Sequence, residues 1–152
     1  MEQRINVFEK GQSAMRAMYG LSTYLANSTV EQPLLNLIYF RVSQINGCAY
    51  CLDMHSKDLR AKGETEQRLY LLDAWREAPM YTERERVALA WTEALTQIKG
   101  GQVSDAIYDE VKQQFNEAEI IDLTLAVITI NGYNRINIAF RPPAGTYKVG
   151  QY

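Results

Sequence analysis

The order of hydrophobic and polar positions along this chain of 152 residues is helical almost throughout. Apolar residues recur every three or four positions, so they fall on one face of a helix. The segment 31–45 is a clear example, and its apolar residues follow at intervals of four, four and three: Leu34, Ile38, Val42 and Ile45. No stretch alternates convincingly between apolar and polar residues, as a half-buried strand does. The pattern therefore predicts an all-α protein without internal repeats.

Start and stop signals divide this pattern into about six to seven helices. After an extended start, the expected spans are 8–26, 31–45, 48–62, 65–75, one beginning after Thr82, a short one after Ser104, and 120–140. Thr82 and Asn116 each begin a capping box, because a glutamate follows three residues later. Gly63 follows the third span, where a left-handed residue is favoured. Residues 141–152 are expected to form an extended tail, since two prolines follow the last helix.

The length of the chain predicts one domain over residues 1–152, long enough to bury a core without disulfide staples. The expected helix over 120–140 is apolar around most of its circumference. A helix of that kind is either central in its own domain or buried in an interface with another subunit. The candidate chemistry, described next, falls within residues 31–63.

The charge of the chain argues against two classes of partner, nucleic acids and anionic membranes. A net charge of −2 gives no basic surface for nucleic acid or for an anionic membrane. The most apolar stretch of the chain, residues 120–130, is too short to span a bilayer and carries Asp122. The first residues lack the apolar run of a secretory signal. We therefore expect a cytoplasmic protein that binds neither nucleic acid nor membranes.

The only two cysteines and the only histidine of the chain lie within eight residues of one another. On a helix, Cys51 lies about 60° around the axis from Cys48, and His55 lies about 40° from Cys51. The three side chains then share one stripe, with Cys51 in the middle. Cα atoms three residues apart on a helix are about 5–5.5 Å from each other, which is within the range of a disulfide. A helix start would also lower a thiol pKa, because free N–H groups favour the thiolate.

Other interpretations of this cluster remain open. Two buried, inert cysteines and a surface histidine are the plainest of them. Zinc is another, because Cys-x₂-Cys-x₃-His contains ligands that zinc accepts. However, no further Cys or His supplies a fourth ligand, and three ligands spread over about 10 Å of helix converge poorly on one ion. Covalent haem requires a histidine directly after the second cysteine, where this chain has Leu52. We therefore expect no metal and no cofactor.

A more specific pattern surrounds the cysteines. It consists of Ser43-Gln44-Ile45-Asn46-Gly47-Cys48-Ala49-Tyr50-Cys51, His55, and a later element Asn131-Gly132-Tyr133-Asn134-Arg135. This pattern resembles the AhpD-like alkylhydroperoxidase family, which shares its fold with the carboxymuconolactone decarboxylases. The resemblance covers most of the chain and implies an AhpD-like helical bundle. It also implies a homo-oligomer, either a trimer or a hexamer.

The resemblance implies a thiol peroxidase or disulfide reductase. Carried over by position, Cys51 is the peroxidatic thiol, Cys48 the resolving thiol, and His55 part of a proton relay. A peroxide would oxidise Cys51 to a sulfenic acid, and Cys48 would then form a disulfide with it. An external dithiol partner would reduce that disulfide.

One position departs from the family pattern. The relay of the family usually includes a glutamate twelve residues before the first cysteine, where this chain has Asn36. An amide cannot accept a proton at neutral pH. Glu31 does not replace it simply, because it lies about 140° around the same helix. We therefore expect weak peroxidase activity, or a preference for another oxidant or disulfide.

Two other functions remain as alternatives. One is a non-redox decarboxylase or lyase acting on a small organic acid, although that branch does not need a CxxC. The other is a non-enzymatic redox sensor or interaction module whose disulfide switches assembly. Around the cluster, we expect Tyr50 to be a packing or pocket-wall residue and Asp58 to be a surface charge. We expect the element Tyr133-Asn134-Arg135 to tie the last helix to a neighbouring subunit rather than to line the pocket near the thiols.

Overall fold

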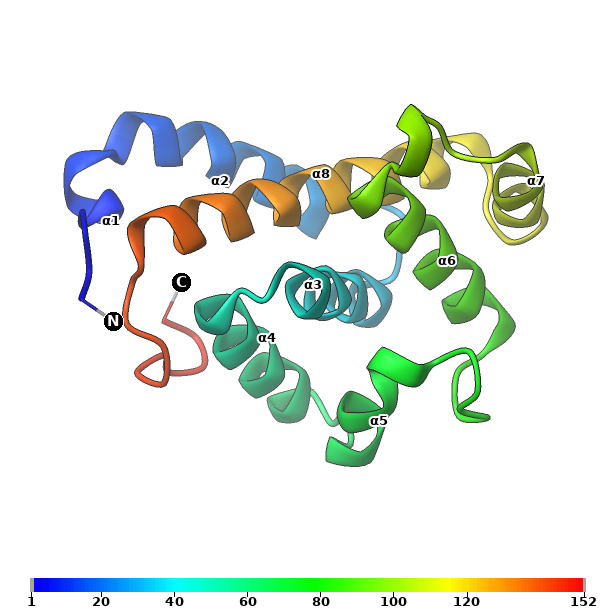
Figure 1. The fold of residues 1–152 in the computed structure, drawn as a ribbon, viewed down its shortest axis with the longest axis horizontal. Coiled ribbons are helices and arrows are strands. Elements are labelled where there is room, and N and C mark those ends of the chain that lie inside the picture. Colours follow the sequence, from blue (N-terminus) through cyan, green and yellow to red (C-terminus); the bar gives the residue numbers. More distant parts are fainter. Residues whose placement is uncertain (1, 152) are drawn as a thin grey trace.

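The computed structural model describes residues 2–151, and all of its regular elements are helical (Figure 1). The α-helices are α1 (Val7–Lys10), α2 (Gln12–Ala26), α3 (Gln32–Asn46), α4 (Ala49–Ala61), α5 (Glu66–Leu71), α6 (Glu83–Gln97), α7 (Asp105–Gln114) and α8 (Glu117–Phe140). Two 3₁₀ turns, η1 (Leu72–Ala74) and η2 (Lys99–Gly101), complete the described part. The predicted all-α class is confirmed, and the structure adds the short helix α1 to the expected set.

Helices α3 and α8 form the centre of the fold. Helix α8 packs against α2, α3 and α6, and α3 also packs against α4 (Figure 1). The fully buried side chains Leu35, Ile38 and Leu123 belong to the apolar core between these helices. One part of α8 is nevertheless exposed, including Ile121 at 66% and Ile128 at 58%. The expected helix over 120–140 is therefore central, yet it also presents apolar side chains at the surface.

A second apolar cluster joins α3, α4, α5 and α6. Its buried members include Phe40, Leu59, Leu72 and Trp75. Leu59 is the buried residue that α4, the helix that follows Cys48, contributes to this cluster. The position of α4 relative to α3 is therefore set by packing along its length.

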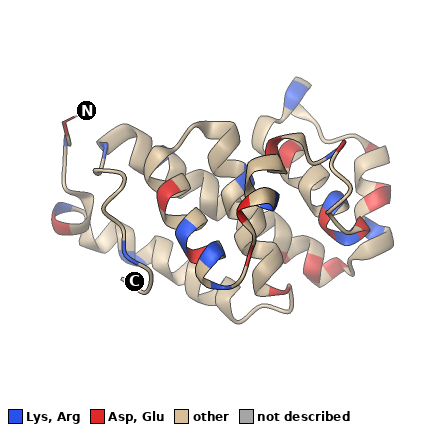
Figure 2. Ribbon diagram, turned by 90° about the horizontal axis from the view of Figure 1, so that it is seen from below, with Lys and Arg blue, Asp and Glu red and all other residues tan. Residues whose placement is uncertain are grey.

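Several predicted helix boundaries are confirmed by hydrogen bonds. Thr82 and Asn116 form complete capping boxes with Glu85 and Glu119. Gly63 has a φ of 95°, which is the left-handed conformation expected after the third helix. The charged residues of both signs are interspersed over the helices (Figure 2). No helix in the described residues is long and apolar enough to cross a membrane.

Two boundaries differ from the sequence prediction. The expected first helix, 8–26, is interrupted at Gly11, whose φ of −110° and ψ of 26° are not helical. The preceding turn is a separate helix capped by the side chain of Asn6. The expected helix 65–75 is α-helical only to Leu71 and continues as a 3₁₀ turn. Periodicity locates apolar faces well, but it does not register a local change in backbone conformation.

The segment after α8 is not simply extended. It turns at Gly145 and lies along α4, where Lys57 donates a hydrogen bond to the carbonyl of Tyr147 at 3.0 Å. The hydroxyl of Tyr147 donates to Asp58 at 2.9 Å, and its ring is buried. Side-chain contacts that proline spacing does not reveal thus determine the course of this segment. The final residue of the predicted tail, Tyr152, lies outside the described residues.

Candidate redox site

The junction between α3 and α4 places Cys48 at a helix start. Gly47 ends α3 in the left-handed conformation, with a φ of 67°, and the N–H of Cys48 donates to the carbonyl of Ser43. Cys48 itself is extended and is the N-cap of α4. Its sulfur accepts a hydrogen bond from the backbone N–H of Cys51 at 3.4 Å. The expected position of Cys48 at or near a helix start is confirmed.

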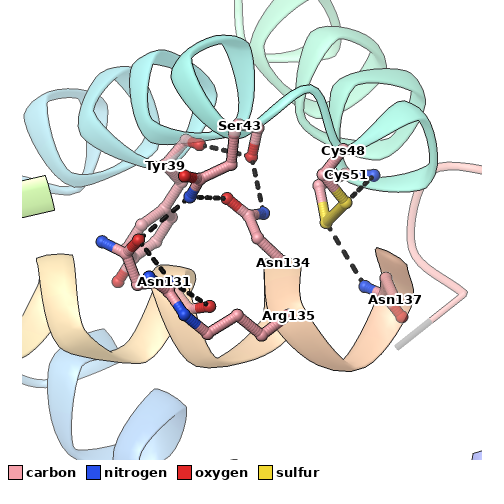
Figure 3. Close-up of a disulfide and its surroundings, with 9 residues drawn as sticks. Tyr39, Ser43, Cys48, Cys51, Asn131, Asn134, Arg135 and Asn137 are labelled. Atoms are coloured by element: carbon pink, nitrogen blue, oxygen red, sulfur yellow. Dashed lines mark hydrogen bonds between the residues drawn. A yellow bond between two sulfur atoms is a disulfide. The ribbon is translucent and has the colours of Figure 1, made fainter. Parts of the chain in front are cut away.

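Cys48 and Cys51 form a disulfide, and their Cα atoms are 5.4 Å apart (Figure 3). This separation agrees with the distance expected for two residues three positions apart at the start of a helix. Both cysteines are buried, so the protein surrounds the bond on most sides. The structure therefore contains the oxidised form of the pair.

Asn137, a residue that the sequence did not indicate, contacts the second sulfur. Its side-chain amide donates to Sγ of Cys51 at 3.3 Å from the last turns of α8 (Figure 3). Each sulfur of the pair thus accepts one N–H hydrogen bond. Donors of this kind favour a thiolate over a thiol. A signal was present in the sequence, because Asn131, Asn134 and Asn137 recur every three residues on a largely apolar helix.

An asparagine network fixes the residues just before Cys48. The amide of Asn46 donates to the side-chain oxygens of Asn131 and Asn134, both at 2.9 Å (Figure 3). Asn134 is fully buried and donates in turn to Ser43 at 3.1 Å. These contacts join the end of α3 to the middle of α8. They give Asn134 a structural role within the chain, whereas Tyr133 of the same element lines the cavity described below, which was the less favoured expectation.

His55 lies one turn beyond Cys51 on α4 and is buried. Its Nε2 atom has no hydrogen-bond partner among the described residues. Its ring faces that of Tyr39, with 5.5 Å between the centroids. Burial, and secondarily the charge of Lys62, lower the pKa of His55 to about 4. The imidazole is therefore neutral at pH 7, and Asp58 does not orient it, because Asp58 binds Tyr147 instead.

A cavity of about 360 Å³ lies beside the disulfide, between α2, α3, α4 and α8. Cys51 and His55 both line it, whereas Cys48 does not. Tyr50 is one of its wall residues, as expected, and Tyr133 is another. Asn137 also lines the cavity, so the wall contains both Cys51 and the residue whose amide donates to its sulfur.

Asn36, the expected relay position, lies on α3 between Gln32 and Tyr39, which both line this cavity. It is buried on α3, and its amide donates to the carbonyl of Gln32 at 2.7 Å. It is not among the residues that line the cavity. The carboxylate of Glu31 is paired with Arg84 at 2.7 Å, so it does not take the place of the missing glutamate. Cys51 and His55 thus line the cavity, with Cys48 bonded to Cys51, whereas Asn36 is one helical turn from two lining residues without lining the cavity itself.

Within residues 2–151, no group of three or more His, Cys, Asp or Glu side chains is arranged to hold a metal ion. The groups that line the cavity include Cys51, which is bonded to Cys48, a neutral imidazole, amides and hydroxyls. The disulfide bond can exchange two electrons with an external dithiol by thiol–disulfide exchange.

Comparisons with known proteins agree with this geometry. The carboxymuconolactone decarboxylase family model matches residues 12–94, which include both cysteines and His55. The uncharacterized protein YdfG of Bacillus subtilis is 41% identical over 139 residues, covering 91% of this chain and 95% of YdfG.

Solved structures show the same fold. A protein of unknown function from Agrobacterium tumefaciens, proposed to be the antioxidant defence protein AhpD, is 38% identical. It superposes with a TM-score of 0.91, covering 96% of this chain and 100% of that one. The debrominase Bmp8, solved in complex with 2,3,4-tribromopyrrole, has a TM-score of 0.80 at 20% identity over 91% of this chain and 74% of its own. The chain therefore belongs to the carboxymuconolactone decarboxylase family and has the AhpD-like fold.

Proposed function

We propose that the protein is a thiol-dependent peroxidase that reduces hydroperoxides through the Cys48–Cys51 pair. One observation carries this proposal. Of the two bonded cysteines, Cys51 lines the cavity and Cys48 does not. A substrate in the cavity would therefore meet Cys51 first, as a peroxidatic residue requires, and Cys48 would be in place to resolve the product.

The first step would oxidise Cys51. Its sulfur attacks the terminal oxygen of the hydroperoxide, the O–O bond breaks, and the thiol proton passes to the departing oxygen. A thiol and a hydroperoxide thus give a sulfenic acid and an alcohol. The sulfur of Cys48 then attacks Sγ of Cys51, which forms the disulfide and releases water. An external dithiol returns the pair to two thiols and is itself oxidised to a disulfide.

His55 and Asn137 would assist this chemistry in different ways. The amide of Asn137 would stabilise negative charge on the Cys51 sulfur, to which it already donates. His55 would relay the proton between the thiol and the departing oxygen, and the free Nε2 atom suits that task. An imidazole with a pKa of about 4 is a weak base. Together with Asn36 in place of a glutamate, it supports a slow peroxidase.

The experiment that tests the proposal uses single-cysteine variants. Reduced protein is treated with one equivalent of cumene hydroperoxide, and the thiols are mapped by mass spectrometry with a sulfenic-acid probe. We expect a trapped sulfenic acid on Cys51 in the Cys48→Ser variant and a much slower reaction in the Cys51→Ser variant. Equal reactivity of the two variants would overturn the assignment of Cys51.

Turnover separates an enzyme from a redox sensor. With excess dithiothreitol as the external dithiol, a peroxidase consumes many equivalents of hydroperoxide for each protein chain. A sensor or interaction module would instead be oxidised once and change its assembly. Sedimentation of the reduced and oxidised forms follows that change and also tests the expected trimer or hexamer, for which the exposed isoleucines of α8 would supply apolar contact area.

A further inference from the structure

We infer that the cavity takes an uncharged ligand with an aromatic ring, so that the substrate is a neutral aryl-bearing hydroperoxide rather than hydrogen peroxide or an anionic hydroperoxide. That the ligand is a substrate and a hydroperoxide rests on the proposed function. The class of ligand itself rests on the cavity alone. The size of the cavity, the charge of its wall and the hydrogen bonding of its polar groups all favour such a ligand.

The cavity is large for a small oxidant. Its volume of about 360 Å³ corresponds to the space of about twelve water molecules in the liquid. Hydrogen peroxide has only two heavy atoms and would leave most of this space unfilled. Pockets of a few hundred Å³ are typical of sites that enclose an organic molecule. Size therefore favours an organic hydroperoxide with a substantial carbon skeleton.

The wall of the cavity is aromatic and carries no cation. Five aromatic side chains other than His55 line it: Phe8, Tyr19, Tyr39, Tyr50 and Tyr133. No lysine, arginine, aspartate or glutamate lies among the described lining residues. A carboxylate would lose its hydration there without gaining a partner, which is costly. An uncharged ring would instead pack favourably against the aromatic side chains of the wall.

Most polar side chains of the wall are already hydrogen-bonded within the protein. Ser22 and Tyr133 share a hydrogen bond of 3.0 Å, and Thr129 donates to the carbonyl of Leu125 at 2.7 Å. The Nε2 atom of His55 is the buried lining atom that lacks a partner in the described part of the chain. His55 lies one helical turn from Cys51 on α4. The arrangement therefore suits a ligand with one small polar end at the thiols and an apolar ring beyond it.

Binding of unreactive alcohols tests the ligand class without thiol chemistry. The probes are 2-phenyl-2-propanol, the product of cumene hydroperoxide, and the same alcohol with a para-carboxylate. Affinity for the oxidised protein is measured by calorimetry and by the NMR signal of His55, the only histidine. We expect the carboxylate to bind at least tenfold more weakly than the neutral alcohol. Equal or tighter binding of the carboxylate would overturn the inference.

A charge inserted at the cavity wall should reverse this preference. Thr23 is an exposed residue of α2 that lines the cavity, so an arginine is tolerated there. Thr23→Arg should tighten binding of the carboxylate at least tenfold, while the matched variant Thr23→Gln should not. An unchanged ratio of the two affinities in Thr23→Arg would contradict the inference that charge controls binding.

Reaction rates then connect the ligand class to the proposed function. In a single turnover, cumene hydroperoxide should oxidise Cys51 at least tenfold faster than its para-carboxylate or hydrogen peroxide. Faster oxidation by either of the latter would overturn the inference. Selective binding of the neutral alcohol, without oxidation of Cys51 by any hydroperoxide, would instead overturn the peroxidase function and leave the ligand class confirmed.

Discussion

The side-chain amide of Asn137 donates a hydrogen bond to Sγ of Cys51 at 3.3 Å, between residues 86 positions apart in the chain. The contact joins the end of α8 to the first turn of α4. The Cys51 sulfur is thus influenced from two directions, by the helix on which it lies and by the amide of a second helix. Electrostatic control of the thiol is shared between distant parts of the sequence.

Removal of the Asn137 amide should raise the pKa of the Cys51 thiol. A hydrogen bond to a charged group contributes about 1.5–3 kcal/mol. Asn137→Ala should therefore raise the pKa of this thiol, because the thiolate loses that stabilisation. The pH dependence of alkylation by iodoacetamide measures it, in a Cys48→Ser background that leaves one thiol.

Two further variants complete this test. Asn137→Asp places a negative charge beside the sulfur and should raise the pKa of the Cys51 thiol further. Asn27→Ala removes an exposed amide that donates to the carbonyl of Thr23, and it should leave the alkylation profile unchanged. An unaltered profile in Asn137→Ala would show that this amide does not stabilise the thiolate.

His55 should make the protein less stable in mild acid. Its pKa is about 4 in the folded protein, below the ordinary value of 6.5, because burial disfavours the charged form. Between these values the unfolded chain binds a proton that the folded protein does not, so the free energy of unfolding falls as the pH falls. The loss approaches about 3 kcal/mol near pH 4.

Urea unfolding at several pH values measures this effect. The wild type should lose more stability than His55→Gln between pH 6.5 and 4, because carboxylates contribute equally to both proteins. NMR titration of the single histidine checks the cause directly. A midpoint near 6.5 in the folded protein would contradict the assignment of His55 as a buried neutral imidazole.

Asn36→Glu tests the hypothesis that a missing carboxylate limits the reaction. The variant removes the amide that donates to the carbonyl of Gln32, so we expect it to lower the free energy of unfolding by about 1–3 kcal/mol. Single-turnover oxidation of Cys51 should nevertheless become faster near neutral pH. Asn36→Gln keeps the added length without the acid and should give no gain. Equal rates in the two variants would exclude a relay at this position.

The contact between Tyr147 and Asp58 should hold the final segment on α4. Tyr147→Phe loses one hydrogen bond and should cost about 0.5–1.5 kcal/mol. Tyr147→Ala also removes a buried ring and should cost about 3–5 kcal/mol. Hydrogen exchange of peptides from α4 measures the result. We expect faster exchange in Tyr147→Ala than in Tyr147→Phe. Equal protection of α4 in the wild type and in both variants would show that the segment does not stabilise this helix.

The parts of the site that sequence analysis found are local in the chain. Cys48, Cys51 and His55 lie on one helix, and helical geometry alone relates their positions. The separation of the two cysteine Cα atoms was therefore predicted closely. Capping boxes were found for the same reason, because each depends on residues three positions apart.

The parts that sequence analysis missed depend on tertiary packing. Asn137 reaches Cys51 only because α8 crosses the start of α4, and no spacing rule predicts that crossing. The interruption at Gly11 and the course of Tyr147 over α4 likewise follow from local dihedral angles and long-range hydrogen bonds. The sequence shows that an amide replaces the expected glutamate at Asn36, but only the structure shows that Asn36 does not itself line the cavity.

Cys48 is both a partner in the disulfide and the N-cap of α4. A thiolate at a helix N-terminus is more favourable than a neutral sulfur at the same place, because it faces the positive end of the dipole. Any free energy that α4 gives to the reduced pair makes the disulfide easier to reduce, and therefore a stronger oxidant. The reduction potential of the pair and the stability of the first turn of α4 therefore depend on the same interaction. Evolution can adjust both at this helix end without altering the cavity.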